Sequence, residues 1–275
     1  MLEQRQRTLK TSAVMKGRGL HTGKECRVAM LPAAPDTGVV FVTGRGEIEA
    51  AVRNVRDTRR GTSLGKGDAE IHTVEHLLAA VAGLGVDNVR IEVDGPEIPA
   101  GDGSALPFVE LIESAGIEEQ GGEARVIQLA KPVWAADSGK YLLAVPAVGF
   151  RVSALISFQH RMIGEQAISL AVEPKTFKRE IAPARTFCTA DEIETILSQG
   201  LGRGGNKDNV IVVHDDHCSV PLRFEDELVR HKVLDLIGDL SLINGRLHAD
   251  VTAIKTSHGL NIALAAKIAR EGATR

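Results

Sequence analysis

The chain has 275 residues, of which 43% are hydrophobic and 25% are charged. This is the composition of a globular protein, and it excludes a chain that is mainly disordered. The 33 basic and 36 acidic side chains give a net charge of -3, which excludes the strongly basic surface of a dedicated nucleic-acid-binding protein. The length fits one large domain or two smaller ones.

The N-terminal residues 1–10 contain no apolar stretch of the kind that a secretory signal requires. No run in the chain approaches the roughly 18 apolar residues of a transmembrane segment. The three cysteines, Cys26, Cys188 and Cys218, are far apart in the sequence and form no metal-binding or redox pair, so we expect reduced thiols. The sequence therefore predicts a cytoplasmic protein without a transmembrane segment.

The first half of the chain combines strands with two helices. Short β-branched runs between Gly and Pro predict mostly antiparallel strands over residues 7–55. Apolar residues at helical spacing predict a buried helix over residues 72–84, followed by a strand at 88–93 and a helix at 107–115. The glycine pair at 121–122 is the expected domain boundary.

The second half has a similar order of strands and helices. The expected elements are strands within 125–172, a helix at 190–198, a glycine-rich loop at 200–205, a strand at 210–213, a long amphipathic helix at 225–243, a strand at 251–255 and a helix at 258–270. Because strands precede helices in each half, the pattern favours an α+β fold over a parallel βαβ sheet.

Two histidines of the first predicted helix, His72 and His76, are four residues apart and are therefore expected on one face. With Glu75 between them they match the H-x-x-E-H pattern of the inverzincin metallopeptidases. Such a short match arises easily by chance. The alternative is one surface histidine at the start of the helix and one buried, hydrogen-bonded histidine.

A second group lies on the long helix, where His231, Asp235 and Asp239 follow one another at steps of four residues. This spacing places them in one polar stripe of a largely apolar helix. A histidine and an aspartate four residues apart are well spaced to hold one zinc ion. The spacing alone leaves open a solvated charged face, because acidic and basic residues also crowd the helix start.

The third group, Thr256, Ser257 and His258, lies between a predicted strand and a predicted helix start. The positive end of the helix dipole disfavours a charged imidazole, whereas a nearby carboxylate favours it. His258 could therefore have a pKa near neutrality. The alternative is that Ser257 caps the helix and His258 is a surface residue of its first turn.

Taken together, these groups belong to a series of nine ordered motifs. They are QRTLK at 6–10, GLHTG at 19–23, TVEHLLAA at 73–80, DGPEIP at 94–99, DGSA at 102–105, ARTF at 184–187, RFEDE at 223–227, RHKVLD at 230–235 and SH at 257–258. In this order the series resembles the UDP-3-O-acyl-N-acetylglucosamine deacetylases, zinc enzymes of lipid A biosynthesis in Gram-negative bacteria. The resemblance covers nearly the whole chain.

The resemblance implies one zinc ion per chain, bound by His76, His231 and Asp235 with water in the open fourth position. Three protein ligands with one open position are typical of a catalytic zinc site. Glu75 is the implied general base. The resemblance gives His72 no role, so the metallopeptidase pattern becomes a coincidence.

The remaining implied roles concern the substrate and the proton transfers. Asp239 is implied to pair with the catalytic residue His258, and Lys232 to contact the substrate near its diphosphate. Thr186 is implied to help bind the oxyanion, and Phe187 to line the sugar or acyl region. Whether Glu75 alone or together with His258 transfers the protons stays open at this point.

The implied reaction is hydrolysis of the N-acetyl group of UDP-3-O-(3-hydroxyacyl)-N-acetylglucosamine to acetate and the free amine, the committed step of lipid A biosynthesis. The implied fold has two α+β domains, residues 1–122 and 123–275, each with a mostly antiparallel sheet layered against helices and with the active site in the cleft between them. An insertion at about 189–216 is implied to form a passage for the acyl chain, with Leu201, Val210 and Val212 as suitable lining residues. The partner is the UDP-linked substrate, and we expect a monomer.

Two other functions are weighed against this one. A zinc peptidase of the inverzincin type would need His72 as a metal ligand, and a zinc-dependent nucleotide-sugar-binding protein without enzyme activity would not need Glu75 or His258. The metal content of His72→Ala and His231→Ala distinguishes the peptidase from the deacetylase, and the activity of Glu75→Ala distinguishes the deacetylase from the binding protein.

Overall fold

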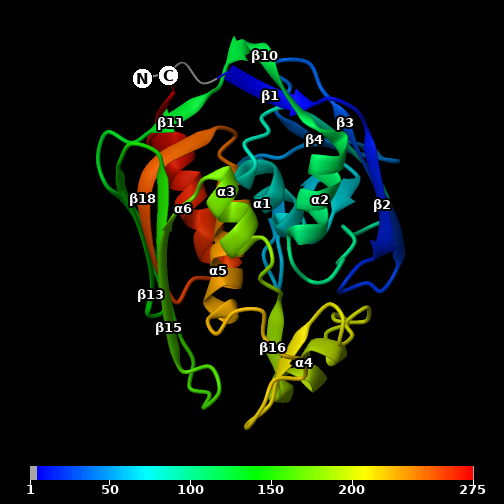
Figure 1. Cartoon of the computed structure of the whole chain (residues 1–275), viewed down its shortest axis with the longest axis vertical. Helices are drawn as coiled ribbons and strands as arrows, with labels where there is room; N and C mark the ends of the chain where they lie inside the picture. Colours follow the sequence, from blue (N-terminus) through cyan, green and yellow to red (C-terminus); the bar gives the residue numbers. More distant parts are fainter. Residues whose placement is uncertain (1–4, 275) are drawn as a thin grey trace.

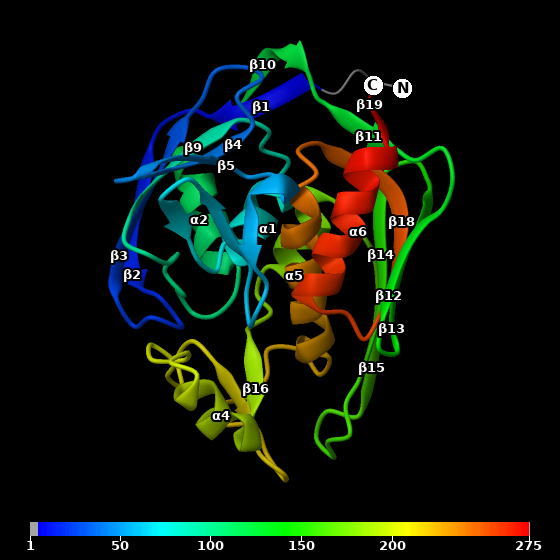
Figure 2. The ribbon, with the colours of Figure 1, turned by 180° about the vertical axis from the view of Figure 1, so that it is seen from behind.

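The fold is a mixed α/β arrangement in which helices lie between two sheets. It is taken from a computed structural model, which describes residues 5–274; residues 1–4 of the N-terminal segment and residue 275 lie outside the described residues. Helices α1, α2, α5 and α6 occupy the middle of the molecule, with a five-stranded sheet on one side and a seven-stranded sheet on the other (Figures 1 and 2). Within the described part of the chain, no helix is long and apolar enough to cross a membrane.

The five-stranded sheet belongs to the first half of the chain. In spatial order its strands are β2 (Ala13–Arg18), β3 (Glu25–Pro32), β9 (Val89–Asp94), β4 (Val39–Thr43) and β5 (Gly46–Glu49). A separate three-stranded sheet contains β6 (Val55–Asp57), β7 (Ser63–Lys66) and β8 (Ala69–Ile71). The helices of this half are η1 (Val52–Asn54), α1 (Glu75–Gly83) and α2 (Leu106–Ala115).

The seven-stranded sheet belongs to the second half. Its strands are β11 (Val126–Gln128), β12 (Val133–Asp137), β13 (Lys140–Pro146), β14 (Phe150–Ser157), β15 (Glu165–Ala171), β18 (Arg246–Ile254) and β19 (Ala273–Thr274). The helices of this half are α3 (Pro174–Thr176), η2 (Phe177–Ile181), η3 (Ala190–Glu192), α4 (Ile193–Ser198), α5 (Glu227–Ser241) and α6 (His258–Glu271).

Most pairings of the described strands are antiparallel, as the sequence predicts, but the sheets are mixed. β4 pairs in parallel with β9, and β14 pairs in parallel with β18. A small unit projects from one end of the molecule (Figures 1 and 2), where β16 (Phe187–Thr189) pairs in parallel with β17 (Ile211–Val213) and α4 lies between them in the sequence. This unit runs from Phe187 to Val213 and so contains most of the segment 189–216 that the resemblance implies to be an insertion.

The predicted element boundaries are wrong at two places that matter for the site. The first helix begins at Glu75, so His72 lies before it and forms an isolated β-bridge with Glu97. The reason is Thr73, whose φ of 58° is incompatible with a helix. Strand β18 begins at Arg246, five residues before the predicted strand, because alternate residues from Leu247 onward are buried.

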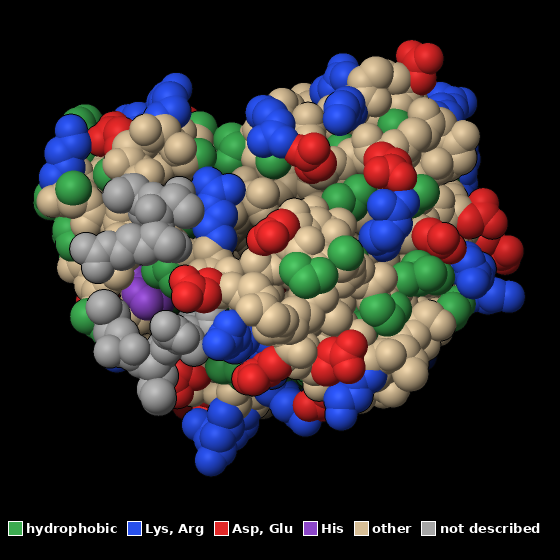
Figure 3. Space-filling model, turned by 90° about the horizontal axis from the view of Figure 1, so that it is seen from above, with side chains coloured by type: hydrophobic (Ala, Val, Ile, Leu, Met, Phe, Trp, Pro, Cys, Tyr) green, Lys and Arg blue, Asp and Glu red, His purple; other side chains and the backbone are tan. Residues whose placement is uncertain are grey.

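The glycine pair expected at the domain boundary is part of a strand. Gly121 and Gly122 lie inside β10 (Ile117–Glu123), which pairs with β1 (Arg5–Leu9) across the end of the molecule where both termini lie (Figure 1). Seen from that end, basic and acidic side chains are interspersed over the surface (Figure 3). The short helices α3 and η2, which begin at Pro174 and carry the buried Phe177, were not predicted.

Helices α1 and α5 pack closely against each other in the centre of the molecule. Gly238 makes this approach possible, because a Cβ atom there would lie 2.1 Å from the backbone oxygen of Glu75. Nearly all of α1 is buried, and so is the face of α5 that carries Leu234 and Ile237. The two helices that carry the predicted metal ligands are therefore held together by a tight backbone contact.

We expect Gly238→Ala to destabilise the protein by about 1–3 kcal/mol, because the added methyl group overpacks this contact. On an exposed helix the same substitution would stabilise by roughly 1 kcal/mol, so the sign of the change is informative. Urea denaturation measures the effect, with Gly121→Ala as the control, since a Cβ atom at Gly121 meets nothing within 4 Å. A Gly238→Ala protein at least as stable as the parent would contradict the tight contact.

Candidate metal centre and active site

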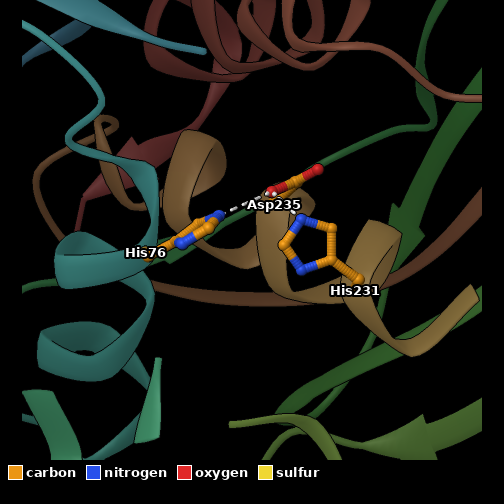
Figure 4. A group of neighbouring side chains, drawn as sticks. All are labelled: His76, His231 and Asp235. Carbon is orange, nitrogen blue, oxygen red and sulfur yellow. Dashed lines mark ion pairs between the residues drawn. The ribbon is translucent and has the colours of Figure 1, made fainter. Parts of the chain in front are cut away.

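Three buried side chains from two helices converge on one point. His76 is on α1, and His231 and Asp235 are one turn apart on α5 (Figure 4). Their ligand atoms lie within 4.8 Å of one another. Asp235 Oδ1 is 3.5 Å from His76 Nε2 and 3.4 Å from His231 Nε2. A tetrahedron with metal–ligand bonds of about 2.0–2.1 Å has edges of about 3.3–3.4 Å, so this arrangement suits a four-coordinate metal ion.

The hydrogen bonding of Asp235 provides an independent test of this fit. Its Oδ2 atom accepts a hydrogen bond of 2.8 Å from Lys232 Nζ. Its Oδ1 atom has no hydrogen-bond partner, and among the described side chains only His248 Nδ1 shares this buried, unpartnered state. A buried carboxylate oxygen without a donor is costly unless something else, such as a cation, compensates it. The unpartnered oxygen is the one that faces both imidazoles.

The second nitrogen of His231 determines which nitrogen is free for a metal. His231 Nδ1 is 3.1 Å from the backbone oxygen of Ala184 and donates to it. This bond fixes the tautomer in which Nε2 carries a lone pair toward Asp235. Backbone at the start of the ARTF motif thus orients a side chain 47 residues away.

The expected protonation states also suit metal binding. Burial lowers the pKa of His231 to about 3, so its imidazole is neutral. Burial opposes ionisation of Asp235, but its charged neighbours outweigh burial, the Lys232 ammonium 2.8 Å from Oδ2 among them, and hold the pKa of this carboxyl well below its ordinary value. A neutral imidazole and an ionised carboxylate are the forms that bind a metal ion.

Glu75 directly precedes His76 and is 3% exposed. Burial raises the pKa of its carboxyl, although the nearby His258 and His76 oppose this shift. Its Oε2 atom accepts a hydrogen bond of 2.9 Å from the backbone N–H of Thr62. A buried carboxyl with a raised pKa beside a metal-ligand group has the properties of a general base.

On the other side of the ligand group, His258 forms a pair with Asp239. The Nδ1 atom of His258 donates to Asp239 Oδ2 over 2.9 Å, and its Nε2 atom lies 3.9 Å from Asp235 Oδ2. Burial opposes the charged imidazole, but Asp239 and Asp235 outweigh it and raise the pKa of His258 to about 9. His258 is therefore a cationic acid next to the ligand group, rather than the surface residue of the alternative interpretation.

These side chains open into a cavity of about 610 Å³. The other expected site residues line it as well, namely Thr186, Phe187 and Lys232. The Phe187 ring packs edge-on against His231, with ring centroids 6.3 Å apart, and Lys232 Nζ lies 5.5 Å from the centre of the same ring. Asp239 lies behind His258 and does not line the cavity.

The small unit around α4 forms the far wall of the cavity. Val210 and Val212 line it as expected, and they are joined by three residues of α4, Ile193, Ile196 and Leu197. Leu201, also expected there, is not among the lining residues. The cavity thus has a polar end at the ligand group and a more apolar end at the insertion.

The structure separates His72 from this site. His72 Nδ1 is bonded to Ser63 Oγ over 2.8 Å, and His72 is not part of the ligand group of His76. Conversely, sequence reasoning missed Thr62 and Asn261, both of which donate to Asp239. The helical spacing of three residues between His258 and Asn261 could have indicated the latter, but nothing in the sequence pattern indicated Thr62.

Comparison with known proteins places the chain in one family. The family model described as LpxC: UDP-3-O-acyl N-acetylglycosamine deacetylase matches residues 6–270. The chain is 44% identical over 267 residues to the UDP-3-O-acyl-N-acetylglucosamine deacetylase of Anaeromyxobacter sp. (strain Fw109-5), covering 96% of this chain and 88% of the relative. It is 43% identical over 269 residues to the protein of the same description from Myxococcus xanthus (strain DK1622), with 96% and 86% covered.

The matched range contains the ligand group, Glu75, His258 and the residues that line the cavity. The chain therefore belongs to the LpxC family of UDP-3-O-acyl-N-acetylglycosamine deacetylases, hydrolases of lipid A biosynthesis.

Proposed function

We propose that the chain hydrolyses the N-acetyl group of UDP-3-O-(3-hydroxyacyl)-N-acetylglucosamine with the help of one zinc ion, giving the free amine and acetate. The observation that supports this most directly is the buried, unpartnered Oδ1 atom of Asp235, which faces His76 and His231. A buried cation site beside a candidate base and a candidate acid is an arrangement suited to metal-assisted amide hydrolysis.

The proposed metal ligands are His76, His231 and Asp235. Two imidazole nitrogens and one carboxylate oxygen form a donor set that zinc accepts readily, whereas magnesium and calcium prefer oxygen ligands alone. A zinc ion bound there would supply Lewis-acid chemistry at the substrate carbonyl. Lys232 assists by holding Oδ2 of Asp235, which keeps Oδ1 turned toward the imidazoles.

Glu75 and His258 are proposed to carry out the proton transfers. Glu75 takes a proton from the attacking water, whose oxygen forms the new bond to the amide carbon. The C–N bond then breaks, and the amine nitrogen leaves with a proton, which we assign to the cationic His258. The burial that raises the pKa of Glu75 and the carboxylates that raise the pKa of His258 prepare these two opposite roles.

Negative charge develops on the carbonyl oxygen during this attack and has to be stabilised. The Thr186 side chain, which lines the cavity, is proposed to donate a hydrogen bond to that oxygen. Lys232 is proposed to contact the diphosphate, and Phe187 to line the sugar or acyl region. The apolar end of the cavity, around Ile196 and Val212, then accommodates the acyl chain.

We further propose that the two halves, residues 1–122 and 123–275, are two α+β domains with this cavity in the cleft between them. The contact of α1 with α5 supports this, because it joins a ligand of the first half to two ligands of the second. A cytoplasmic monomer remains our expectation.

The alternative zinc peptidase is disfavoured by the position of His72, which lies before α1 and bonds to Ser63.

We expect His231→Ala to lose bound zinc, because the two remaining ligands cannot compensate for the loss of the third. We expect His72→Ala to retain one zinc per chain. Metal analysis of the two purified variants by mass spectrometry measures this, and loss of zinc from His72→Ala alone would favour the peptidase.

Glu75→Gln preserves the shape of the side chain but removes its basicity. We expect acetate release to fall roughly 10²–10⁴-fold, the range of a general base, while zinc content stays at the parent level. Glu110→Gln, at an exposed position of α2, is the matched control and should keep full activity. If Glu75→Gln instead binds the substrate and releases acetate as the parent protein does, Glu75 is not the general base.

The experiment that tests the proposed function as a whole is acetate release from the UDP-linked substrate before and after removal of metal. We expect a chelator to abolish activity and equimolar zinc to restore it, whereas magnesium should not, because the donor set contains two nitrogens. Full activity of the metal-free protein would contradict the proposal.

A further inference from the structure

Thr62 lies between the two helices of the site, and all three of its polar groups bond to them. Its backbone N–H donates to Glu75 Oε2 over 2.9 Å, and its backbone oxygen accepts from the N–H of Val74 over 3.0 Å. Its hydroxyl donates to Asp239 Oδ1 over 2.6 Å. Thr62 therefore connects the start of α1 with a residue of α5 that is 177 positions away in the sequence.

Thr62 is fully buried and does not line the cavity. It cannot act by touching the substrate. Buried polar groups that lose their partners are costly, so the three hydrogen bonds hold Glu75 and Asp239 in a defined relation to each other.

The effect on Glu75 is to orient its carboxylate. The N–H of Thr62 occupies Oε2, whereas Oε1 accepts no hydrogen bond from the described part of the chain. The preceding residue, Gly61, leaves room next to that free oxygen, because a Cβ atom there would lie only 3.0 Å from Oε1. One oxygen of the carboxylate is thus anchored and the other is available.

The effect on Asp239 is to complete its hydrogen bonding. The Thr62 hydroxyl binds Oδ1, while His258 Nδ1 and Asn261 Nδ2 donate to Oδ2 over 2.9 and 2.8 Å. The Nδ1 atom of His258 already donates to Asp239 and cannot accept, so the hydroxyl proton of Thr62 points to Asp239 and not to that nitrogen, which lies 3.5 Å away. A carboxylate bonded at both oxygens holds the imidazole of His258 in one orientation.

We propose that Thr62 is a positioning residue that fixes the base Glu75 through its backbone and the acid His258 through Asp239. This inference rests on the proposed function, because it assigns Thr62 to the same hydrolysis. It extends the site beyond the residues that the family resemblance indicates.

The test is Thr62→Val, which keeps the shape of the side chain and removes only the hydroxyl. We expect kcat for acetate release to fall about 10–100-fold, as is typical when a partner of a catalytic group is removed, with KM and zinc content within twofold of the parent. Thr62→Ser should restore kcat, and Thr62→Ala should reproduce the loss if Thr62→Val folds poorly.

Thr8→Val is the matched control, because Thr8 is also buried and its hydroxyl also donates, to the backbone oxygen of Asn88 over 2.7 Å. It should lower the melting temperature without lowering kcat.

The combination of Thr62→Val with His258→Ala adds a second readout. If Thr62 acts through Asp239 and His258, Thr62→Val should lower kcat less than twofold in the background that already lacks the imidazole.

A Thr62→Val protein with the kcat of the parent would overturn the inference, and so would a loss of kcat that accompanies loss of zinc. An undiminished, additional loss in the His258→Ala background would also overturn it. The proposed function is tested separately in the same assay, because absence of acetate release by the parent protein would contradict it whatever the result for Thr62→Val.

Discussion

The buried carboxylate of Asp235 is the constraint on which the rest of the site depends. One of its oxygens has no hydrogen-bond partner and lies between two imidazoles, in a region where an uncompensated charge is costly. A cation at this point would compensate that oxygen. Such a site requires α1 and α5 to approach closely, and Gly238 permits the approach by presenting no side chain to the backbone of Glu75.

The surrounding hydrogen bonds make sense as consequences of that constraint. Lys232 holds the other oxygen of Asp235, and the backbone of Ala184 turns the free nitrogen of His231 inward. Farther out, Asp239 keeps His258 cationic, and Thr62 bonds to the carboxylates on both helices. Neutral His231, anionic Asp235 and cationic His258 thus lie side by side in one buried site, each with its protonation state set by its neighbours.

Helical spacing predicts that His231, Asp235 and Asp239 share one face of a helix, but it does not distinguish a metal site from a solvated charged face. Grouping them with His76, Glu75 and His258 depended on the resemblance of the ordered motifs to a known family, because no local pattern connects these distant segments. The same spacing misled at His72, since it assumed a helix through residue 73. The positive φ of Thr73 prevents a helix from continuing through this residue. No sequence pattern indicates that φ, because the residue types around Thr73 are compatible with a helix. Thr62 could not be predicted, because its partners lie 13 and 177 residues away and no periodic pattern connects them.

The direct test of the account is X-ray absorption spectroscopy at the zinc edge on protein loaded with one equivalent of zinc. The account predicts a shell of about four nitrogen and oxygen neighbours at roughly 2.0–2.1 Å, with outer-shell scattering from two imidazoles and no sulfur. A sulfur neighbour near 2.3 Å would place the metal at a cysteine and contradict the account. Scattering from three or more imidazoles would contradict it equally.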